Sequence, residues 1–125
     1  MIHTTLEQSK ALMHLGLRED TADLYYQQTD DPVDVWKLYL GSPDAQNIKP
    51  QVPCWSAGAL LDILPDEIYL DDTVYYLNIW TKNAEWYIQY VQSFNTGDEM
   101  AMSEEGELIN SLFKIVEWLL TNKLL

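Results

Sequence analysis

The last twenty residues of the chain carry its strongest structural signal. From about residue 104 to residue 120, apolar residues recur at helical spacing. This stripe consists of Leu108, Leu112, Ile115 and Leu119, widened by Ile109, Phe113, Val116 and Leu120. Glu104, Glu105 and Glu107 fall in the predicted first turn, where the helix dipole favours anions. An amphipathic helix needs an apolar surface to cover, so the rest of the chain must supply one.

Alternating strands just before this helix predict that surface. Residues 74–80 and 85–92 are predicted strands, joined across 81–84 as a hairpin. A shorter third strand is expected over 99–102, after the Thr96-Gly97-Asp98 turn. Strand meanders covered by one helix are typical of the α+β class, with the C-terminal helix on the sheet.

Capping signals predict helices in the first half. Thr5 with Gln8 forms a capping box, and Gly16 fits the C′ position that ends the first helix. A second short helical piece is expected over 20–26. Ser56 is the expected N-cap of a helix over 57–64, which Pro65 ends.

The length and these signals predict one domain over 1–125. It comprises a helical N-terminal part (1–26), an irregular connection (27–53) and an α-β-β-(β)-α core (54–125). From residue 56 this order is that of a double-stranded-RNA-binding domain. Such domains place cations at the start of the last helix, where this chain has carboxylates, so the shared order predicts topology without that function.

Charge and cysteine content exclude several classes of function. Twenty acidic and seven basic residues give a net charge of −13 over 125 residues, and the basic residues are scattered. Nucleic-acid and anionic-membrane binding need clustered cations, so neither is expected. Cys54 is the single cysteine, which leaves no intramolecular disulfide and no cysteine-based metal site. With no signal-peptide pattern, the expected location is cytoplasmic.

The segment Cys54-Trp55-Ser56-Ala57-Gly58 approaches the G-x-S-x-G nucleophile elbow. A Ser56 or Cys54 nucleophile needs a base, and both histidines, His3 and His14, lie upstream, against the order of the elbow. A plain N-cap accounts for Ser56, and a small buried hydrophobe accounts for Cys54. Adjacent acids such as Asp30-Asp31, Asp66-Glu67, Asp71-Asp72 and Asp98-Glu99 indicate solvated turns, and no metal site or cofactor is predicted.

Aromatic residues exceed what one core face can hold. Neighbours such as Tyr75-Tyr76 and Trp86-Tyr87 point to opposite faces of a strand, so both sheet faces must be covered. The N-terminal half could cover the second face, or the surplus could form an interface, where Tyr and Trp are enriched. The candidate interface anchors are Tyr25, Tyr26, Trp36 and Tyr39.

Three segments, in order, resemble a family of small uncharacterised proteins from Bacteroidales, their phages and mobile elements. They are Glu7–Leu17 with Thr21–Tyr25, then Pro53–Pro65 around Trp55-Ser56 and Ala59-Leu60-Leu61, and finally Glu117–Leu125 with Trp118-Leu119-Leu120. Thr121 departs from the acid of the family's closing pattern. The resemblance implies an intracellular accessory or host-modulating protein, and it assigns no catalytic residue.

The sequence therefore favours a non-catalytic interaction protein that uses an aromatic and acidic surface on a protein partner or on itself. Two alternatives stay open. One is an acidic nucleic-acid mimic that inhibits a basic protein. The other is a small hydrolase that uses Ser56 or Cys54.

Overall fold

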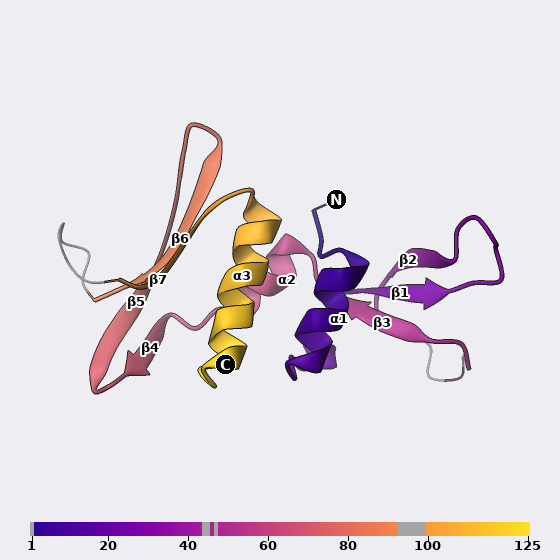
Figure 1. Ribbon diagram of the computed structural model, residues 1–125, viewed down its shortest axis with the longest axis horizontal. Coiled ribbons are helices and arrows are strands. Elements are labelled where there is room, and N and C mark those ends of the chain that lie inside the picture. The colour runs from indigo at the N-terminus through magenta and orange to yellow at the C-terminus, as the bar shows by residue number, and fades with distance from the viewer. Residues whose placement is uncertain (1, 44–45, 47, 93–99) are drawn as a thin grey trace.

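Two antiparallel sheets enclose a layer of helices in the computed structural model, which describes residues 2–43, 46, 48–92 and 100–125 (Figure 1). The first half holds α1 (Leu6–His14), a 3-10 turn (Glu19–Thr21), β1 (Leu24–Gln28), β2 (Trp36–Leu40) and β3 (Gln51–Cys54). The second half holds α2 (Ala57–Ile63), β4 (Glu67–Leu70), β5 (Thr73–Lys82), β6 (Glu85–Val91), β7 (Met100–Gly106) and α3 (Leu108–Thr121).

The strand order is β2-β1-β3 in one sheet and β4-β5-β6-β7 in the other. The three-stranded sheet lies at one end of the long axis beside α1, and the four-stranded sheet lies at the other end beside α3 (Figure 1). The predicted α+β class is confirmed, as is the packing of the C-terminal helix on a sheet. The prediction missed the second sheet.

The first helix has both predicted ends. Thr5 accepts from the backbone of Gln8, and the Gln8 side chain accepts from the backbone of Thr5, which completes the capping box. At the other end Gly16 adopts φ +91° and donates to the carbonyl of Met13, while Leu17 donates to Leu12. This is a Schellman ending, and the buried Leu17 beyond it closes the turn over Leu12.

Residues 20–53 differ most from the prediction. The expected helical piece over 20–26 is wrong, because only Glu19–Thr21 forms a 3-10 turn and β1 begins at Leu24. The connection over 27–53, expected to be irregular apart from a short strand or helix within 33–40, contains the end of β1 and all of β2 and β3. Pairing of β1 with β2 and β3 fixes this segment, and strand pairing is a long-range effect that local turn signals do not reveal.

The second half follows the prediction more closely. Ser56 caps α2, and the hairpin joins β5 to β6 through Asn83 and Ala84, whose φ angles of +54° and +64° fit a tight type I′ turn. The unforeseen β4 pairs with β5 across a similar turn at Asp71 and Asp72. The predicted three-strand order is therefore wrong, since four strands lie between α2 and α3.

The last helix begins later than predicted. Glu104 and Glu105 lie in β7 opposite Ile88 and Tyr87, and not in the first helical turn. Glu107 is the N-cap, without a hydrogen bond from its side chain. The two glutamates belong to β7 because it pairs with β6. The third strand, expected over 99–102, covers residues 100–106. Residue 99 lies outside the described residues.

Packing of α3 on the four-stranded sheet forms the core. The cluster joins α1, α2, β4, β6 and α3 around Leu12, Leu60, Ile88, Tyr90 and Leu112. Trp55 is fully buried in it, and its indole N–H donates to Thr21 at 2.9 Å. None of the described residues of β1, β2 or β3 belongs to this cluster, so the three-stranded sheet lies outside the main core.

Candidate interaction surface

One face of the three-stranded sheet lies toward α1. Residues in register across antiparallel strands share a face, so Leu24 lies beside Cys54, and Tyr26 lies beside Val52. Leu24, Val52 and Cys54 are buried, and α1 contacts β3. The opposite face carries Tyr25, Tyr39 and Pro53 in one row. We call this second face the outer face; Tyr39 on it is exposed, whereas Pro53 and Gln27 on it are buried.

Two of the predicted anchors form an aromatic pair on the outer face. The rings of Tyr25 and Tyr39 stack with centroids 5.5 Å apart and an interplanar angle of 22°. Tyr39 is 43% exposed. Stacked pairs of this kind gain about 0.5–1.5 kcal/mol beyond area burial, so the pair presents a rigid aromatic surface.

The other two predicted anchors lie on the face toward α1. The Tyr26 hydroxyl donates to the carbonyl of Thr4 at 2.9 Å, and Lys10 lies 5.5 Å from the ring centre of Trp36. Burial, with a smaller contribution from Cys54, raises the pKa of Tyr26 to about 12. Tyr26 and Trp36 therefore attach the sheet to the N-terminal segment. The four anchors do not form one surface, because they divide between two faces.

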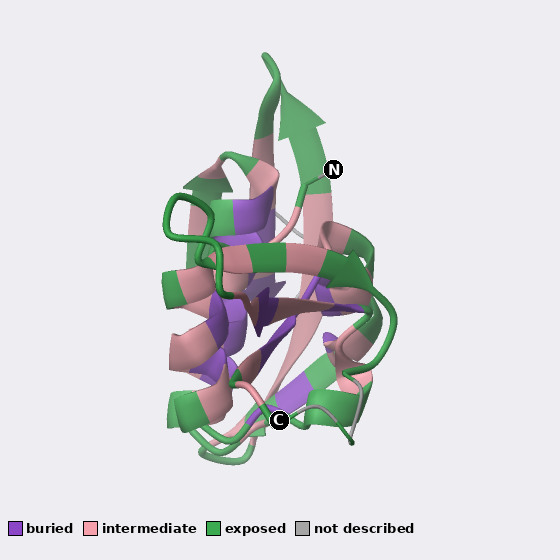
Figure 2. Cartoon of the chain, turned by 90° about the vertical axis from the view of Figure 1, so that its right-hand side faces the viewer, coloured by how far each residue is buried: buried purple, intermediate pink, exposed green. Residues whose placement is uncertain are grey.

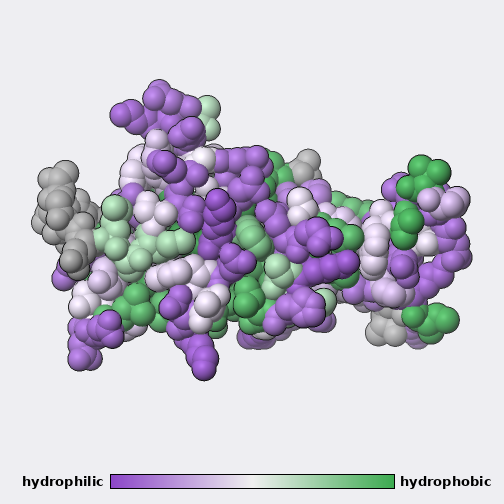
Figure 3. All heavy atoms as spheres, viewed as in Figure 1, coloured by the Kyte–Doolittle hydropathy of each residue, from purple (hydrophilic) through white to green (hydrophobic). Residues whose placement is uncertain are grey.

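Sequence reasoning missed the most exposed apolar residues of this end. Leu40 is 74% exposed, Val33 is 93% exposed and Ile48 is 99% exposed. Seen end-on, this part of the molecule is mostly exposed or half-buried (Figure 2), and separate hydrophobic side chains lie at its tip among hydrophilic ones (Figure 3). The apolar run from residue 33 to residue 40 was the available signal, but its burial could not be judged without β1.

Backbone hydrogen bonds show which residues of β2 face outward. Thr29 donates to the carbonyl of Val35 at 2.6 Å, and Gly41 donates to that of Asp23 at 2.9 Å. Because hydrogen-bonded residues alternate along an antiparallel pair, the backbone groups of Lys37 and Tyr39 also face β1. Those of Trp36, Leu38 and Leu40 face the opposite way. No strand among the described residues pairs with this side of β2.

We call this region the β2 surface. It consists of the outward backbone edge of Trp36, Leu38 and Leu40 with the exposed side chains of Val35, Tyr39 and Leu40. Its only charged residue is Lys37, which lies within β2. An unpaired edge of this kind is a template for pairing with another strand.

The other sheet edges carry features that hinder pairing. Gln28 of β1 donates to the carbonyl of Pro50, just before β3, at 3.0 Å. The same alternation along β3 turns the nitrogen of Pro53 outward, where it has no proton to donate. The edge strand β4 has four residues and begins with Glu67, and β7 carries Glu104 and Glu105. Proline, shortness and charge are the usual protections of edges. The β2 edge has the least protection.

The four-stranded sheet also has an aromatic pair on the face away from the helices. Trp80 and Tyr87 stack at 5.1 Å with nearly parallel rings, and Glu105 lies opposite Tyr87. Desolvation, together with Glu85 and Glu105, raises the pKa of Tyr87. The N-terminal half does not cover this face, because it forms a sheet at the other end of the molecule (Figure 1). Carboxylates make this face more polar than the β2 surface.

The structure brings a histidine to Cys54, which sequence reasoning did not foresee. Thr4 donates to the carbonyl of Trp55 at 2.9 Å, and this pairing sets His3 Nδ1 3.8 Å from the Cys54 sulfur. Cys54 is nevertheless fully buried, and burial raises the pKa of its thiol. A buried, protonated thiol is a poor nucleophile. The prediction of a small buried hydrophobe at Cys54 is confirmed.

Ser56 is engaged in structural hydrogen bonds. Its hydroxyl donates to Asp23 at 2.5 Å and accepts from the backbone N–H of Ala59 at 3.1 Å. The backbone N–H of Ser56 also donates to Asp23, at 2.9 Å. The predicted N-cap is confirmed, and Asp23 adds a tie between the start of β1 and α2. Both hydrogen-bonding functions of the hydroxyl are therefore in use.

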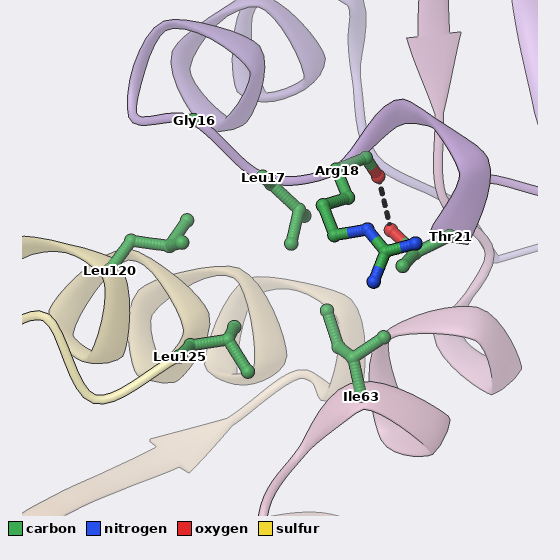
Figure 4. A pocket seen from close by; sticks show the side chains of 7 residues that line it. All are labelled: Gly16, Leu17, Arg18, Thr21, Ile63, Leu120 and Leu125. Atoms are coloured by element: carbon green, nitrogen blue, oxygen red, sulfur yellow. Dashed lines mark hydrogen bonds between the residues drawn. The ribbon is translucent and has the colours of Figure 1, made fainter.

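A pocket of about 350 Å³ lies where the ends of the three helices meet (Figure 4). Leu17, Ile63, Leu120 and Leu125 line it, and the Arg18 side chain lies across it. The guanidinium already forms an ion pair with Asp20, and its side chain is largely exposed. The pocket thus has an apolar wall but no unpaired polar group among its described lining residues to orient a ligand.

Within residues 2–43, 46, 48–92 and 100–125, no three His, Cys, Asp or Glu side chains come together as a metal site. None of the helices described is long and apolar enough to cross a membrane. The chain matches no protein-family model, no curated protein and no solved structure.

Proposed function

We propose that this chain is a non-catalytic interaction protein that binds protein through the β2 surface. The observation that carries the proposal is the outward edge of β2, the least protected edge of the two sheets, flanked by exposed Tyr39 and Leu40. Scattered exposed apolar residues are ordinary on monomers, but an apolar edge strand with free backbone groups is a recognised binding mode. The interaction takes place in the cytoplasm, as an accessory function of the kind that the family resemblance implies.

The β2 edge can supply both the hydrogen bonds and the apolar contacts that stabilise binding of a partner strand. Backbone groups of Trp36, Leu38 and Leu40 exchange water for a partner strand, which is worth about 0.5–1.5 kcal/mol per hydrogen bond. Burial of Leu40 and Tyr39 adds apolar contact at about 25 cal/mol per Å². The rest of the molecule need not move, since β1 already holds β2 along its other side.

The two alternatives receive less support. In the Asp30-Asp31 segment, the Asp31 carboxylate accepts hydrogen bonds from the backbone N–H groups of Val33 at 2.9 Å and Asp34 at 3.3 Å. These two bonds lower the pKa of the Asp31 carboxyl. Asp71 and Asp72 form the β4–β5 turn. Local structure therefore accounts for these acids without a phosphate-like array. A hydrolase would need Ser56 or Cys54, and both are engaged as described above.

Affinity capture from a lysate of the encoding organism tests the proposal. The bait is the wild-type chain, a Leu40→Glu variant, or a Tyr69→Glu control whose residue is 64% exposed on the four-stranded sheet. Both substitutions add one carboxylate at an exposed site, so the change in net charge is the same, and circular dichroism of each bait verifies its folding. We expect the bound protein to be lost with Leu40→Glu and retained with Tyr69→Glu.

Equal retention by all three baits would contradict the proposal. Salt also distinguishes the proposed β2 contact from an acidic mimic, since apolar and backbone contacts persist at high ionic strength. Capture that disappears in high salt for every bait, and is indifferent to Leu40, would instead favour the acidic mimic.

A further inference from the structure

We infer that β2 pairs antiparallel with β2 of a second copy, so that two three-stranded sheets join into one continuous sheet across the dimer. The inference rests on the proposed function and names the partner of the same surface. It follows from the alternation of backbone groups along β2, from the order of its side chains and from the distribution of charge.

Backbone alternation restricts the register. Only Trp36, Leu38 and Leu40 offer outward N–H and C=O groups, so these residues must face one another in the dimer. A two-fold axis at Leu38 places Leu38 opposite Leu38 and Trp36 opposite Leu40 of the second copy. All three outward residues then form hydrogen-bonded pairs, which exchange two bonds each.

Side-chain order favours the same register. With the axis at Leu38, Lys37 lies opposite Tyr39 of the second copy, in a non-hydrogen-bonded pair whose side chains are close. A cation beside an aromatic ring is favourable there. A shift of the axis to Lys37 opposes two lysines, and a shift to Tyr39 opposes two tyrosines. Either shift also leaves one outward residue of the strand unpaired.

Charge distribution allows this contact despite the net charge of −13. Residues 24–54 contain four acidic and two basic residues, a net charge of −2, so the remaining residues carry −11. Pairing through β2 sets the acidic four-stranded sheets at the far ends of the dimer, because they lie opposite the three-stranded sheet along the long axis (Figure 1). Repulsion between the copies is therefore smallest at this edge.

The first test is sedimentation velocity over a concentration series, comparing wild type, Leu38→Pro and Leu38→Ala. We expect a weak, reversible dimer in the wild type, since one strand pair is a small interface. Proline removes an N–H that faces outward and leaves the β1 bonds intact, as Pro53 does in β3. The loss of one donor per copy should weaken association by about 10-fold to 100-fold.

Leu38→Ala is the matched control, because it removes the same side chain but keeps the donor. It should weaken the dimer less than Leu38→Pro does. Far-ultraviolet circular dichroism and thermal unfolding of each variant verify that β2 still pairs with β1. Equal weakening by proline and alanine in folded variants would overturn the backbone pairing.

The second test reads the register. In the inferred dimer, Tyr39→Glu sets a carboxylate opposite Lys37 of the second copy, whereas Tyr39→Lys sets a like charge there. We expect Tyr39→Glu to tighten and Tyr39→Lys to weaken association, by about twofold to tenfold each. Equal weakening by Tyr39→Glu and Tyr39→Lys would overturn the register, because a Lys37 opposite residue 39 must distinguish the two charges.

Failure of the inference and failure of the proposed function give different results. A wild-type chain that is monomeric across the series overturns the dimer. If capture then still depends on Leu40, the β2 surface binds a different protein and the proposed function stands. If the chain is monomeric and capture ignores Leu40, both are overturned.

Discussion

The two sheets of this protein are built alike but are anchored differently. Each turns one face to a helix and carries a stacked aromatic pair on the other, Tyr25 with Tyr39 in one and Trp80 with Tyr87 in the other. The four-stranded sheet contributes Ile88 and Tyr90 to the main core under α3. None of the described residues in the strands of the other sheet belongs to that core.

This difference assigns stability of the fold to one sheet and the proposed binding surface to the other. The four-stranded sheet and α3 hold the fold, and charged or short strands protect its edges. The three-stranded sheet is attached through α1, Tyr26 and the Asp23–Ser56 contact, and its β2 edge is the least protected of the sheet edges. A sheet outside the main core can change its edge residues at small cost to the fold, which makes it the suitable place for a binding surface.

The largest expected effect is a core truncation beneath the four-stranded sheet. Leu112→Ala removes a fully buried side chain of α3, and we expect the free energy of unfolding to fall by about 2–5 kcal/mol. The same truncation in β2, Leu40→Ala, should cost less than about 0.5 kcal/mol because Leu40 is exposed. Urea unfolding followed by tryptophan fluorescence measures both. Comparable losses would show that the two sheets share one core.

A smaller effect is expected at the contact between the two regions. Asp23→Ala removes the acceptor of both the Ser56 hydroxyl and the Ser56 backbone N–H. We expect a loss of about 1 kcal/mol, with Asp23→Asn losing less because it retains one acceptor oxygen. Urea unfolding compares the two variants. If Asp23→Ala were neutral, Asp23 would not tie β1 to α2.

A further expected effect is a dependence of stability on high pH. The pKa of Tyr26 is raised from 10.0 to about 12 in the folded chain, so the folded state holds this proton more tightly than the unfolded state. Its contribution to stability is complete below pH 10 and is lost as the pH rises through 12. Tyr26→Phe should flatten that decline and leave the response of buried Tyr90 in place. An unchanged pH profile in Tyr26→Phe would contradict the assignment.

Local signals predicted the elements whose ends are fixed by their own residues. The Thr5–Gln8 capping box, the Ser56 cap and the hairpin connection within 81–84 are short-range features, and each was found in the structure, the connection as a turn at Asn83 and Ala84. The amphipathic stripe of α3 was equally readable, since a helical period needs no partner.

Long-range pairing explains what the sequence could not show. Glu104 and Glu105 look like the start of a helix, but pairing with β6 draws them into β7. The approach of His3 to Cys54 joins residues 51 positions apart. Tyr25 and Tyr39 lie on one face of the three-stranded sheet, and Tyr26 and Trp36 lie on the other. Which of these faces α1 contacts could not be read from the sequence. Of the β2 surface, the sequence singled out only Trp36 and Tyr39, and it did not show that Leu38 and Leu40 share an outward edge, because that depends on the pairing of β2 with β1.

Amide hydrogen exchange along β2, measured by NMR at low and high protein concentration, tests the central claim most directly. At low concentration we expect Lys37 and Tyr39 to be protected by β1, and Trp36, Leu38 and Leu40 to exchange rapidly. At high concentration the latter three should gain protection as the second copy pairs with them. Protection of Trp36, Leu38 and Leu40 that is the same at both concentrations would contradict the account.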